Sequence, residues 1–426
     1  MKLEIKQRIE QIHQSEIPEA YKKTKAGILP GDWDVYMLGD CLSRVERPVE
    51  VKPNELYTQI GIRSHGKGLF YKEPIAGATL GNKAVFWIEP DCFIVNIVFA
   101  WEQAIGKTTQ SEVGMIGSHR FPMYRPVNDR VDIDYLISYF LTKRGTDILE
   151  AASPGGAGRN KTLGQDRFLK SKIVLPPIEE QQKIAAILTT QDKVIELKER
   201  RLAEKQRQKK HLMQQLLTGK KRLPGFSEEW KIKPLKKLTE KQKKKNHGFQ
   251  YRLVLSNSAQ HGIVSQDQEF DKEIANEERI DGYYVVIPGA FVYNPRISVT
   301  APCGPINVNE TGETGIMSPL YTVFTISSPQ ISQDFLKYYF QSSCWYKYVK
   351  GVANYGARHD RISISDGDFF DMPIPLPTKE EQSYIAKVLS ASNREIELLQ
   401  QDIEQEKQKK KALMQLLLKG IVRVKI

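Results

Sequence analysis

The chain has 426 residues, too many for one hydrophobic core, because single cores stop growing at about 250–300 residues. Its 63 Lys and Arg residues outnumber its 51 Asp and Glu residues, and the net charge of +12 favours a polyanionic partner such as nucleic acid over a simply basic, solvated surface. No run of about 18 apolar residues occurs and the first residues carry charges throughout, so we expect a cytoplasmic protein without a membrane span or a signal peptide.

The first part of the chain predicts a helical segment followed by a globular domain. Ile5, Ile9 and Ile12 recur at helical spacing, which indicates an amphipathic helix in an N-terminal helical segment, residues 1–27. Residues 28–170 then contain short apolar runs at 84–88 and 93–98 that are typical of strands, and a helical pattern at 134–141. This first domain is therefore expected to be of the α+β class, with loops rich in Gly and Pro.

A long helix is predicted in the next segment, residues 171–222. Pro176 precedes it, Glu179 and Glu180 stand where the positive end of the helix dipole favours carboxylates, and Gly219 ends it. The predicted helix runs from Glu179 to Thr218, which corresponds to about 60 Å at 1.5 Å per residue. Such a length exceeds that of an ordinary globular helix and suits a spacer.

The second part of the chain follows the same plan. Residues 223–370 predict a second mixed domain, with strands at 283–287 and 321–326 and a helix at 334–340. Residues 371–426 predict a second long helix, which begins after Pro377 with Glu380 and Glu381 and ends at Gly420.

This order of elements reflects an internal repeat. A shift of 201 residues aligns 168–223 with 369–424 without a gap and gives 22 identities in 56 positions. Weaker similarity extends into both globular domains, where residues 89–96 resemble 287–294 and residues 134–140 resemble 334–340. The chain thus consists of two variable domains, each followed by a better-preserved helix.

The apolar residues of both long helices recur at heptad spacing, with Lys209 and Lys410 interrupting the series, which indicates that each helix needs a coiled-coil partner. The other copy is the obvious partner. The predicted seam consists of Ile184, Leu188, Ile195, Leu202, Leu212 and Leu216 in the first helix and Ile385, Leu389, Ile396, Leu399, Ile403, Leu413 and Leu417 in the second.

The known catalytic motifs fail when they are tested against the chain. Residues 155–162 nearly spell a phosphate-binding loop, but Asn160 replaces the glycine before Lys161 and no strand precedes it. Residues 294–296 read Asn-Pro-Arg, without the second proline and aromatic residue that methyltransferases use to hold a flipped base. The four cysteines lack metal-site spacing, so we expect reduced core thiols, no metal site and no catalytic residue.

Several loops carry residue types that suit contacts with DNA. Arg can read guanine, Asn and Gln can read adenine, and Lys can contact phosphate, although an ordinary polar loop is the alternative for each residue. The loops occur at corresponding places in the two domains. The candidates are Arg63, Ser64, His65, Lys67, Arg120, Arg159, Asn160 and Lys161 in the first domain, and Asn257, Ser258, Gln260, His261, Arg296, Arg358, His359 and Arg361 in the second.

These patterns together resemble the specificity subunits of type I restriction-modification systems. The resemblance rests on Leu-Pro-Pro-x-x-Glu-Gln-Gln from Leu175, on Leu-Pro-x-x-Glu-Glu-Gln from Leu376, on two helices that end Leu-Met-Gln-x-Leu-Leu-x-Gly, and on Gly27 to Trp33. It covers essentially the whole chain. It implies two tandem target recognition domains separated by two long helices that pair as an antiparallel coiled coil with pseudo-twofold symmetry.

The resemblance also implies a function and partners. Each recognition domain would read one half of a split double-stranded DNA target, and the helices would set the spacer and dock two modification subunits and restriction subunits. S-adenosylmethionine would bind to the modification subunits, and ATP and Mg²⁺ to the restriction subunits, so that this chain itself binds no cofactor and is no enzyme. Two alternatives stay open from the residues alone: a methyltransferase or nuclease with an unrecognised motif, and a coiled-coil adaptor without a DNA role.

Overall fold

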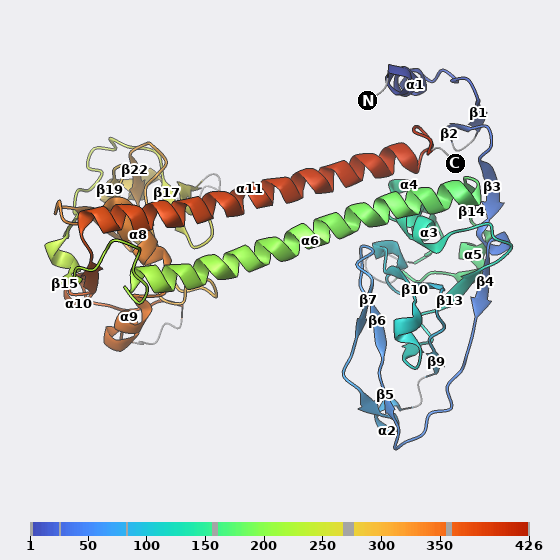
Figure 1. The fold of residues 1–426 in the computed structure, drawn as a ribbon, viewed down its shortest axis with the longest axis horizontal. Coiled ribbons are helices and arrows are strands. Elements are labelled where there is room, and N and C mark those ends of the chain that lie inside the picture. The colour runs from blue at the N-terminus through green and yellow to red at the C-terminus, as the bar shows by residue number, and fades with distance from the viewer. Residues whose placement is uncertain are drawn as a thin grey trace. The chain divides into compact units, whose positions relative to one another are not determined.

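The computed structural model describes residues 3–24, 27–81, 84–155, 161–266, 277–354 and 360–424. The chain divides into two compact units (Figure 1). The first unit contains residues 1–198 and 402–426, and the second contains residues 199–401. Each unit therefore combines one globular domain with the beginning of one long helix and the end of the other. Among the described residues, no helix is long and apolar enough to cross a membrane.

The elements up to the first long helix follow in chain order. Its helices are α1 (Leu3–His13), α2 (Gly77–Leu80), α3 (Ile133–Phe140), α4 (Lys143–Ala151), α5 (Gln165–Lys170) and α6 (Ile178–Leu217), with 3-10 turns η1 (Leu38–Asp40), η2 (Ala100–Glu102) and η3 (Gln110–Glu112). Its strands are β1 (Tyr21–Thr24), β2 (Gly27–Pro30), β3 (Asp34–Met37), β4 (Leu42–Val45), β5 (Leu56–Tyr57), β6 (Ile60–Ile62), β7 (Leu69–Tyr71), β8 (Ile75–Ala76), β9 (Val85–Trp87), β10 (Phe93–Val95), β11 (Ile105–Lys107), β12 (Ile116–Ser118), β13 (Met123–Pro126) and β14 (Lys172–Leu175).

The elements of the second half repeat this series. Its helices are α8 (Gln333–Gln341), α9 (Tyr346–Val352), α10 (Asp366–Phe370) and α11 (Lys379–Leu417), with 3-10 turns η4 (Leu235–Lys237) and η5 (Glu277–Gly282). Its strands are β15 (Lys231–Pro234), β16 (Thr239–Lys241), β17 (Leu255–Ser258), β18 (Gly262–Ser265), β19 (Tyr284–Val286), β20 (Phe291–Tyr293), β21 (Ile306–Val308), β22 (Gly315–Met317), β23 (Thr322–Ile326) and β24 (Pro373–Leu376).

The two domains share one sheet topology. The first has a four-stranded antiparallel sheet in the order β11-β10-β13-β4, and the second has the matching order β21-β20-β23-β16. The hairpin β6-β7 corresponds to β17-β18, and the pair β9-β12 corresponds to β19-β22. The strand before each long helix pairs with a strand near the start of its domain, β14 with β3 and β24 with β15. The predicted α+β class and the internal repeat are confirmed.

In the described part of the predicted N-terminal helical segment, residues 1–27, the only helix is α1. The chain turns after His13, where Ser15 has a left-handed φ of 63°, and strand β1 then pairs antiparallel with β2. The helical spacing of Ile5, Ile9 and Ile12 is consistent with a helix that ends at His13. The next element, β1, begins at Tyr21.

The long helices pair antiparallel within each unit. In the first unit Lys410 of α11 contacts Asp192 of α6, while Asp402 lies 2.8 Å from Lys198. In the second unit, Met213 and Leu216 near the end of α6 share an apolar cluster with Ile385 and Leu389 near the start of α11. Every seam residue predicted from the heptads is buried or half-buried.

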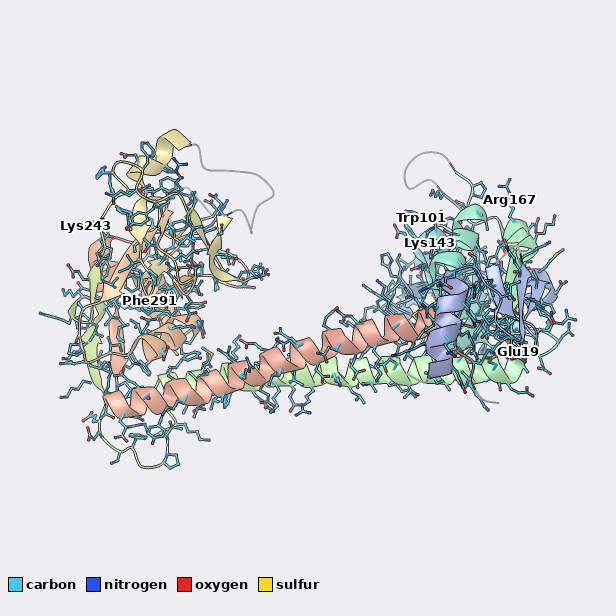
Figure 2. All side chains as sticks on the ribbon, turned by 90° about the horizontal axis from the view of Figure 1, so that it is seen from above. Glu19, Trp101, Lys143, Arg167, Lys243 and Phe291 are labelled. Carbon is cyan, nitrogen blue, oxygen red and sulfur yellow. The ribbon has the colours of Figure 1, made fainter. Side chains whose placement is uncertain are left out.

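The globular cores include the ends of the long helices. In the first unit Phe93, Phe140 and Phe168 cluster with Leu188 of α6 and Leu417 of α11. The second unit repeats this with a core around Phe291, which Figure 2 labels inside the domain, and with Leu389 and Leu217 from the two helices. Each domain is therefore fused to its part of the helix pair through one continuous core.

Candidate nucleic-acid interface

In the first unit, four of the predicted residues lie in the turn between β6 and β7. Ser64 Oγ donates a hydrogen bond to Glu102 Oε2 (3.0 Å), and the His65 amide donates to the Glu102 carbonyl (2.8 Å). These bonds fix the turn onto η2. The side chains of Arg63, His65 and Lys67 remain exposed, so they are available to a ligand.

The Arg63 side chain is partly committed to its own hairpin. Its guanidinium lies 5.0 Å from the centroid of the Phe70 ring, and Nη1 donates to the Leu69 carbonyl (2.5 Å). The ring lies so close to Gly61 that a Cβ there would be 2.2 Å from it. Glycine at position 61 therefore permits the stacking that orients Arg63.

Arg120 and Lys161 come from two other loops that meet around Ile97. The Ile97 amide donates to the Arg120 carbonyl (3.0 Å), and the Leu163 amide donates to the Ile97 carbonyl (2.8 Å). Lys161 Nζ lies 5.3 Å from the centroid of the ring of Trp101, a residue of η2 that Figure 2 labels. Since η2 also holds the Ser64 turn, the structure brings Lys161 and this turn to the same element.

In the second unit, a cavity of about 380 Å³ collects four predicted residues. The cavity is lined by Asn257, Ser258, Arg296 and Arg361. Arg296 and Arg361 are bridged through their backbones, and both guanidiniums lie near the carboxylate of Asp360, at 3.9 and 3.7 Å. Two cations beside hydroxyl and amide groups suit binding of a phosphate or a base edge.

Asn257 itself is occupied within the domain. Its Nδ2 donates to the Val292 carbonyl (2.7 Å), its Oδ1 accepts from Asn307 Nδ2 (2.7 Å), and the side chain is buried. These bonds hold the end of β17 against β20. In this conformation Asn257 therefore positions the loop, and the exposed groups beside it are free to meet a ligand.

Asn294, which the sequence analysis did not select, also lines this cavity. Its Oδ1 accepts from the Arg296 amide (3.0 Å) and its Nδ2 donates to the Asn257 carbonyl (3.1 Å). Asn96 makes the corresponding turn in the first domain, where its Oδ1 accepts from the Val98 amide (3.1 Å). The alignment of 89–96 with 287–294 contained this signal, since both segments end in Asn.

Gln260 and His261 lie at the tip of the β17-β18 turn. They are exposed and line a second, larger cavity of about 640 Å³, which also contains Lys209 of α6 and Asn307. Burial lowers the pKa of the Lys209 ammonium. The described candidates of the second domain are thus distributed over two cavities that share the β17-β18 hairpin.

Four candidates, Arg159, Asn160, Arg358 and His359, lie outside the described residues. The structure therefore does not bear on their proposed contacts, which stay predictions.

Sequence reasoning also missed the residues that join each domain to the helices. Glu180, fully buried at the start of α6, accepts from Trp33 Nε1 (3.1 Å) and forms a two-pronged ion pair with Arg423 (2.7 and 2.9 Å). Arg423 also binds both oxygens of Asp32 (2.9 and 2.6 Å). Burial acts to raise the Asp32 pKa, but the hydrogen bond and charge of Arg423 outweigh it and leave that pKa lowered.

The second unit contains the same joint. Glu381 is fully buried at the start of α11 and accepts from Trp230 Nε1 (2.9 Å), Arg222 Nε (2.7 Å) and Arg222 Nη2 (2.8 Å). Arg222 follows α6 and Arg423 follows α11, so each arginine closes the start of the opposite helix. The two arginines are aligned in the repeat, which is the signal that could have identified them.

The glutamine of each Glu-Glu-Gln triplet fixes the neighbouring helix of its domain. Gln181 Oε1 accepts from the amide of Asp132 (3.0 Å), which caps α3, and Gln382 Oε1 accepts from the amide of Ser332 (2.7 Å), which caps α8. Both glutamines also donate to the proline carbonyl that precedes their own helix, at 2.9 Å. The triplet is therefore a structural joint in both units.

The exposed groups of the interface can donate hydrogen bonds and supply positive charge. The thiols are poorer candidates for chemistry, since burial raises the pKa of Cys41 to about 11 and also raises that of Cys303. Among the described residues, no group of three or more His, Cys, Asp or Glu side chains could hold a metal ion.

Comparison with known proteins gives consistent results. A family model described as the type I restriction modification DNA specificity domain matches residues 86–206. The type I restriction enzyme MjaVIII specificity subunit of Methanocaldococcus jannaschii is 24% identical over 432 residues, which cover 96% of this chain and 97% of the relative. Another protein of that organism, assigned as the specificity subunit of the type I restriction enzyme MjaX, is 25% identical over 449 residues, with the same coverage.

Two solved structures share the fold. The crystal structure of the HsdS subunit from Thermoanaerobacter tengcongensis has a TM-score of 0.52 at 18% identity and covers 92% of this chain and 98% of its own. A chain from a structure on complex assembly and conformational transition of the type I R-M system has a TM-score of 0.59 at 20% identity, with 92% and 99% coverage.

The stretch that matches the DNA specificity domain model contains three strands of the first four-stranded sheet and part of α6, and the second domain repeats the topology of that sheet. Over nearly its whole length the chain is similar to type I restriction-modification specificity subunits, the family that its sequence motifs resemble.

Proposed function

We propose that this chain selects the DNA target of a type I restriction-modification complex, with each recognition domain binding one half of a bipartite sequence. The observation that carries the proposal is the duplication of the candidate loops on matching hairpins, β6-β7 and β17-β18. Both present cationic or amide side chains, which suit contacts with phosphates and base edges. Two similar readers in one chain fit a target with two separate parts.

The chain is proposed to be non-catalytic. In this proposal, S-adenosylmethionine is bound by modification subunits and ATP with Mg²⁺ by restriction subunits, while this chain supplies sequence choice and assembly. The direct check is incubation of the purified chain with DNA, S-adenosylmethionine and Mg²⁺. No methylation or cleavage is expected without other subunits, and turnover by the chain alone would identify it as a methyltransferase or nuclease.

The half-site proposal is tested by mapping methylated adenines across the genome in cells with and without this gene. A split sequence motif that is methylated only when the gene is present would support it and would identify both half-sites. Methylation of a single continuous motif would contradict two separate readers. If the chain assembles with its modification subunits but retains no DNA even at low salt, it is an adaptor and not a reader.

Docking of two modification subunits is proposed on a second apolar stripe of each helix. In α6 the exposed Ile187 and Leu197 recur at heptad spacing with the half-buried Val194, on residues that belong to the first unit. In α11 the stripe contains Val388 and Leu398, which are aligned with Ile187 and Leu197 in the repeat and belong to the second unit. Exposed apolar stripes at matching places suit two copies of one helical partner.

Replacement of Leu197 and Leu398 by Ser tests this surface. Both side chains are at least half exposed, at 63% and 50%, so the unfolding free energy should change by no more than about 0.5 kcal/mol per site. Binding of the modification subunits, measured by calorimetry, should weaken at least tenfold. Leu56→Ser is the matched control, since Leu56 is 72% exposed on β5 and should leave binding unchanged. Full binding by the double variant would exclude the stripe as the docking surface.

A further inference from the structure

A groove lies in the first unit where the end of α11 meets the hairpin of α3 and α4. It encloses about 410 Å³, and its apolar lining comes from Tyr139, Leu141, Met414 and Leu418. The remaining lining residues are mostly cationic, and the lining includes no Asp or Glu residue. The cationic residues are Lys143, Arg144, Lys407, Lys410, Lys411 and Lys419. We call this the first groove.

The charges of the first groove are only partly neutralised. Lys143 contacts Asp147, and Lys410 lies 2.5 Å from Asp192 of α6. Lys411 and Lys419 are exposed, and neither forms an ion pair with any residue in the described part of the chain. The groove thus retains excess positive charge next to an apolar floor, along which the methylene stems of the lysines can lie.

The second unit has a groove at the equivalent place. It encloses about 460 Å³, and its α6 residues Gln206, Lys209, Lys210, Met213 and Gln214 are aligned in the repeat with five residues of the first groove. The aligned residues are Lys407, Lys410, Lys411, Met414 and Gln415. This second groove contains two cations in place of six. A duplicated groove with unequal charge indicates two sites for one kind of ligand, of which the first binds more tightly.

Both grooves adjoin the candidate reading loops. In the first unit Gly66 of the β6-β7 turn packs on Leu141, where a Cβ at Gly66 would lie 2.5 Å from the leucine side chain. Gln103, next to η2, donates to Thr146 of α4 (2.5 Å), and Figure 2 shows Trp101 of η2 near Lys143. In the second unit Lys209 lines both the groove and the cavity that contains Gln260 and His261.

The spacing of the cations favours an extended polyanion. Lys407 and Lys411 are four residues apart on α11, and Lys419 lies beyond its end, so the charges follow the helix in steps of about 6 and 12 Å. A single small anion could meet Lys407 and Lys411 together, because they are neighbours on the helix surface, but not Lys419 as well. A nucleic-acid strand presents a row of phosphates, and a lysine that approaches a phosphate displaces the condensed counterion there.

We propose that the two grooves bind the sugar-phosphate backbone of DNA beside each half-site, through lysines at the ends of the long helices. This inference rests on the proposed function, because it requires that the recognition domains hold DNA. It adds a role for the helices, which contribute sequence-independent affinity as well as spacing. The first groove, with more cations, supplies the larger share.

The test compares full-length chains carrying Lys411→Gln and Lys419→Gln with the unchanged protein. Binding to a labelled duplex of random sequence, about 30 base pairs long, is measured over a range of salt concentrations. Loss of two phosphate contacts should reduce the slope of log K against log salt by about two, and should weaken binding about ten- to a hundredfold at 0.1 M salt. Lys210→Gln in the second groove should reduce the slope by about one.

Two control variants show whether a change in slope comes from the lost charge, from a damaged fold, or from the loss of any two lysines. Lys411→Arg with Lys419→Arg keeps the charge and should keep the slope. Lys172→Gln with Lys193→Gln removes two exposed lysines of the first unit that line neither groove, and should also keep the slope. Equal slopes for the unchanged protein and the Lys411→Gln, Lys419→Gln variant would overturn the inference. The inference would also be overturned if this variant kept the slope but no longer assembled with the modification subunits. That result would indicate that the groove binds an acidic surface of a partner protein.

The same experiment separates the two proposals. If the unchanged chain retains no DNA at low salt, alone or with its modification subunits, the proposed function fails and the grooves have no such ligand. If it binds DNA and the charge-removing variants behave as the controls do, only the groove assignment fails.

Discussion

Glu180 and Glu381 are the carboxylates on which the joints of the two units depend. Each is fully buried and accepts from a tryptophan and an arginine, and its removal would leave the tryptophan Nε1 and the arginine Nε without their partner. An isolated buried donor loses the hydrogen bonds that water would have supplied. The neighbouring Glu179 and Glu380 are exposed at the helix starts, where the helix dipole favours their charge.

Replacing Glu180 by Ala should therefore destabilise the protein by about 2–4 kcal/mol, less than the full cost of breaking a buried pair, because the Arg423 side chain is 28% exposed. The matched variant Glu179→Ala should cost about 0.5 kcal/mol. Denaturant unfolding of both variants measures the difference. Equal losses would show that the joint contributes nothing beyond the helix dipole.

The sequence predicted where each long helix begins, but not which residues bind the buried glutamate there. The repeated Glu-Glu-Gln triplet predicted a helix start, since carboxylates favour that position, and the helix begins there. The partners of Glu180 are Trp33 and Arg423, which lie 147 and 243 residues away in the chain, so no local pattern reveals them. Asn257 was selected because an asparagine can read adenine, but its side-chain amide is hydrogen-bonded to Val292 and Asn307 inside the domain.

At the scale of elements, the centre of the helix pair in the first unit is polar. Gln191, which is buried, donates to Glu406 Oε2 (2.6 Å), and Lys198 donates to Glu406 (2.9 Å) and to Asp402 (2.8 Å). A buried polar residue in a coiled-coil seam specifies the register of the two helices, since any shift leaves it unpaired. The heptad reading, which counts apolar positions, did not include this cluster.

The cluster predicts a specific pH dependence. The hydrogen bond from Lys198, together with that from Gln191, lowers the pKa of Glu406 from 4.5 to about 2. A carboxyl that is more acidic when folded takes up a proton on unfolding, so its stabilisation is present above about pH 4.5 and is lost as the pH falls towards 2. The melting temperature of Glu406→Gln should fall less steeply over this interval than that of the unchanged protein. Glu404→Gln, at an exposed site of α11, should retain the steeper fall.

Helices could be predicted more closely than strands. The predicted first long helix, 179–218, differs by one residue at each end from α6, because proline, the acidic pair and Gly219 mark its limits. The strand predicted at 93–98 is only β10, Phe93–Val95, since the apolar run continues into a buried turn at Asn96. Pairings such as β10 with β13 join residues far apart in the chain, and periodicity carries no information about them.

At the scale of the whole molecule, the long helices are expected to act as a ruler. Inserting four residues after Lys198 and four after Gln401 lengthens both helices by about 6 Å while leaving the ion pairs inside each unit intact. The spacer between the two half-sites should then increase by about two base pairs, at 3.4 Å per pair. Methylation mapping with the lengthened chain gives the spacer directly, and an unchanged spacer would contradict the ruler. Insertion in one helix alone should instead weaken the pairing and lower the melting temperature.

The shared ends of the helices also impose an order on biosynthesis. The first unit needs Leu417 for its core and Arg423 for its joint, and both are translated after the entire second unit. Until the end of α11 has been translated, the first domain therefore lacks the side chains of α11 that cover Ile184 and Leu188. Nascent chains that stop before residue 413 should consequently expose apolar surface in the domain made first, and they become clients for chaperones in spite of an intact second unit.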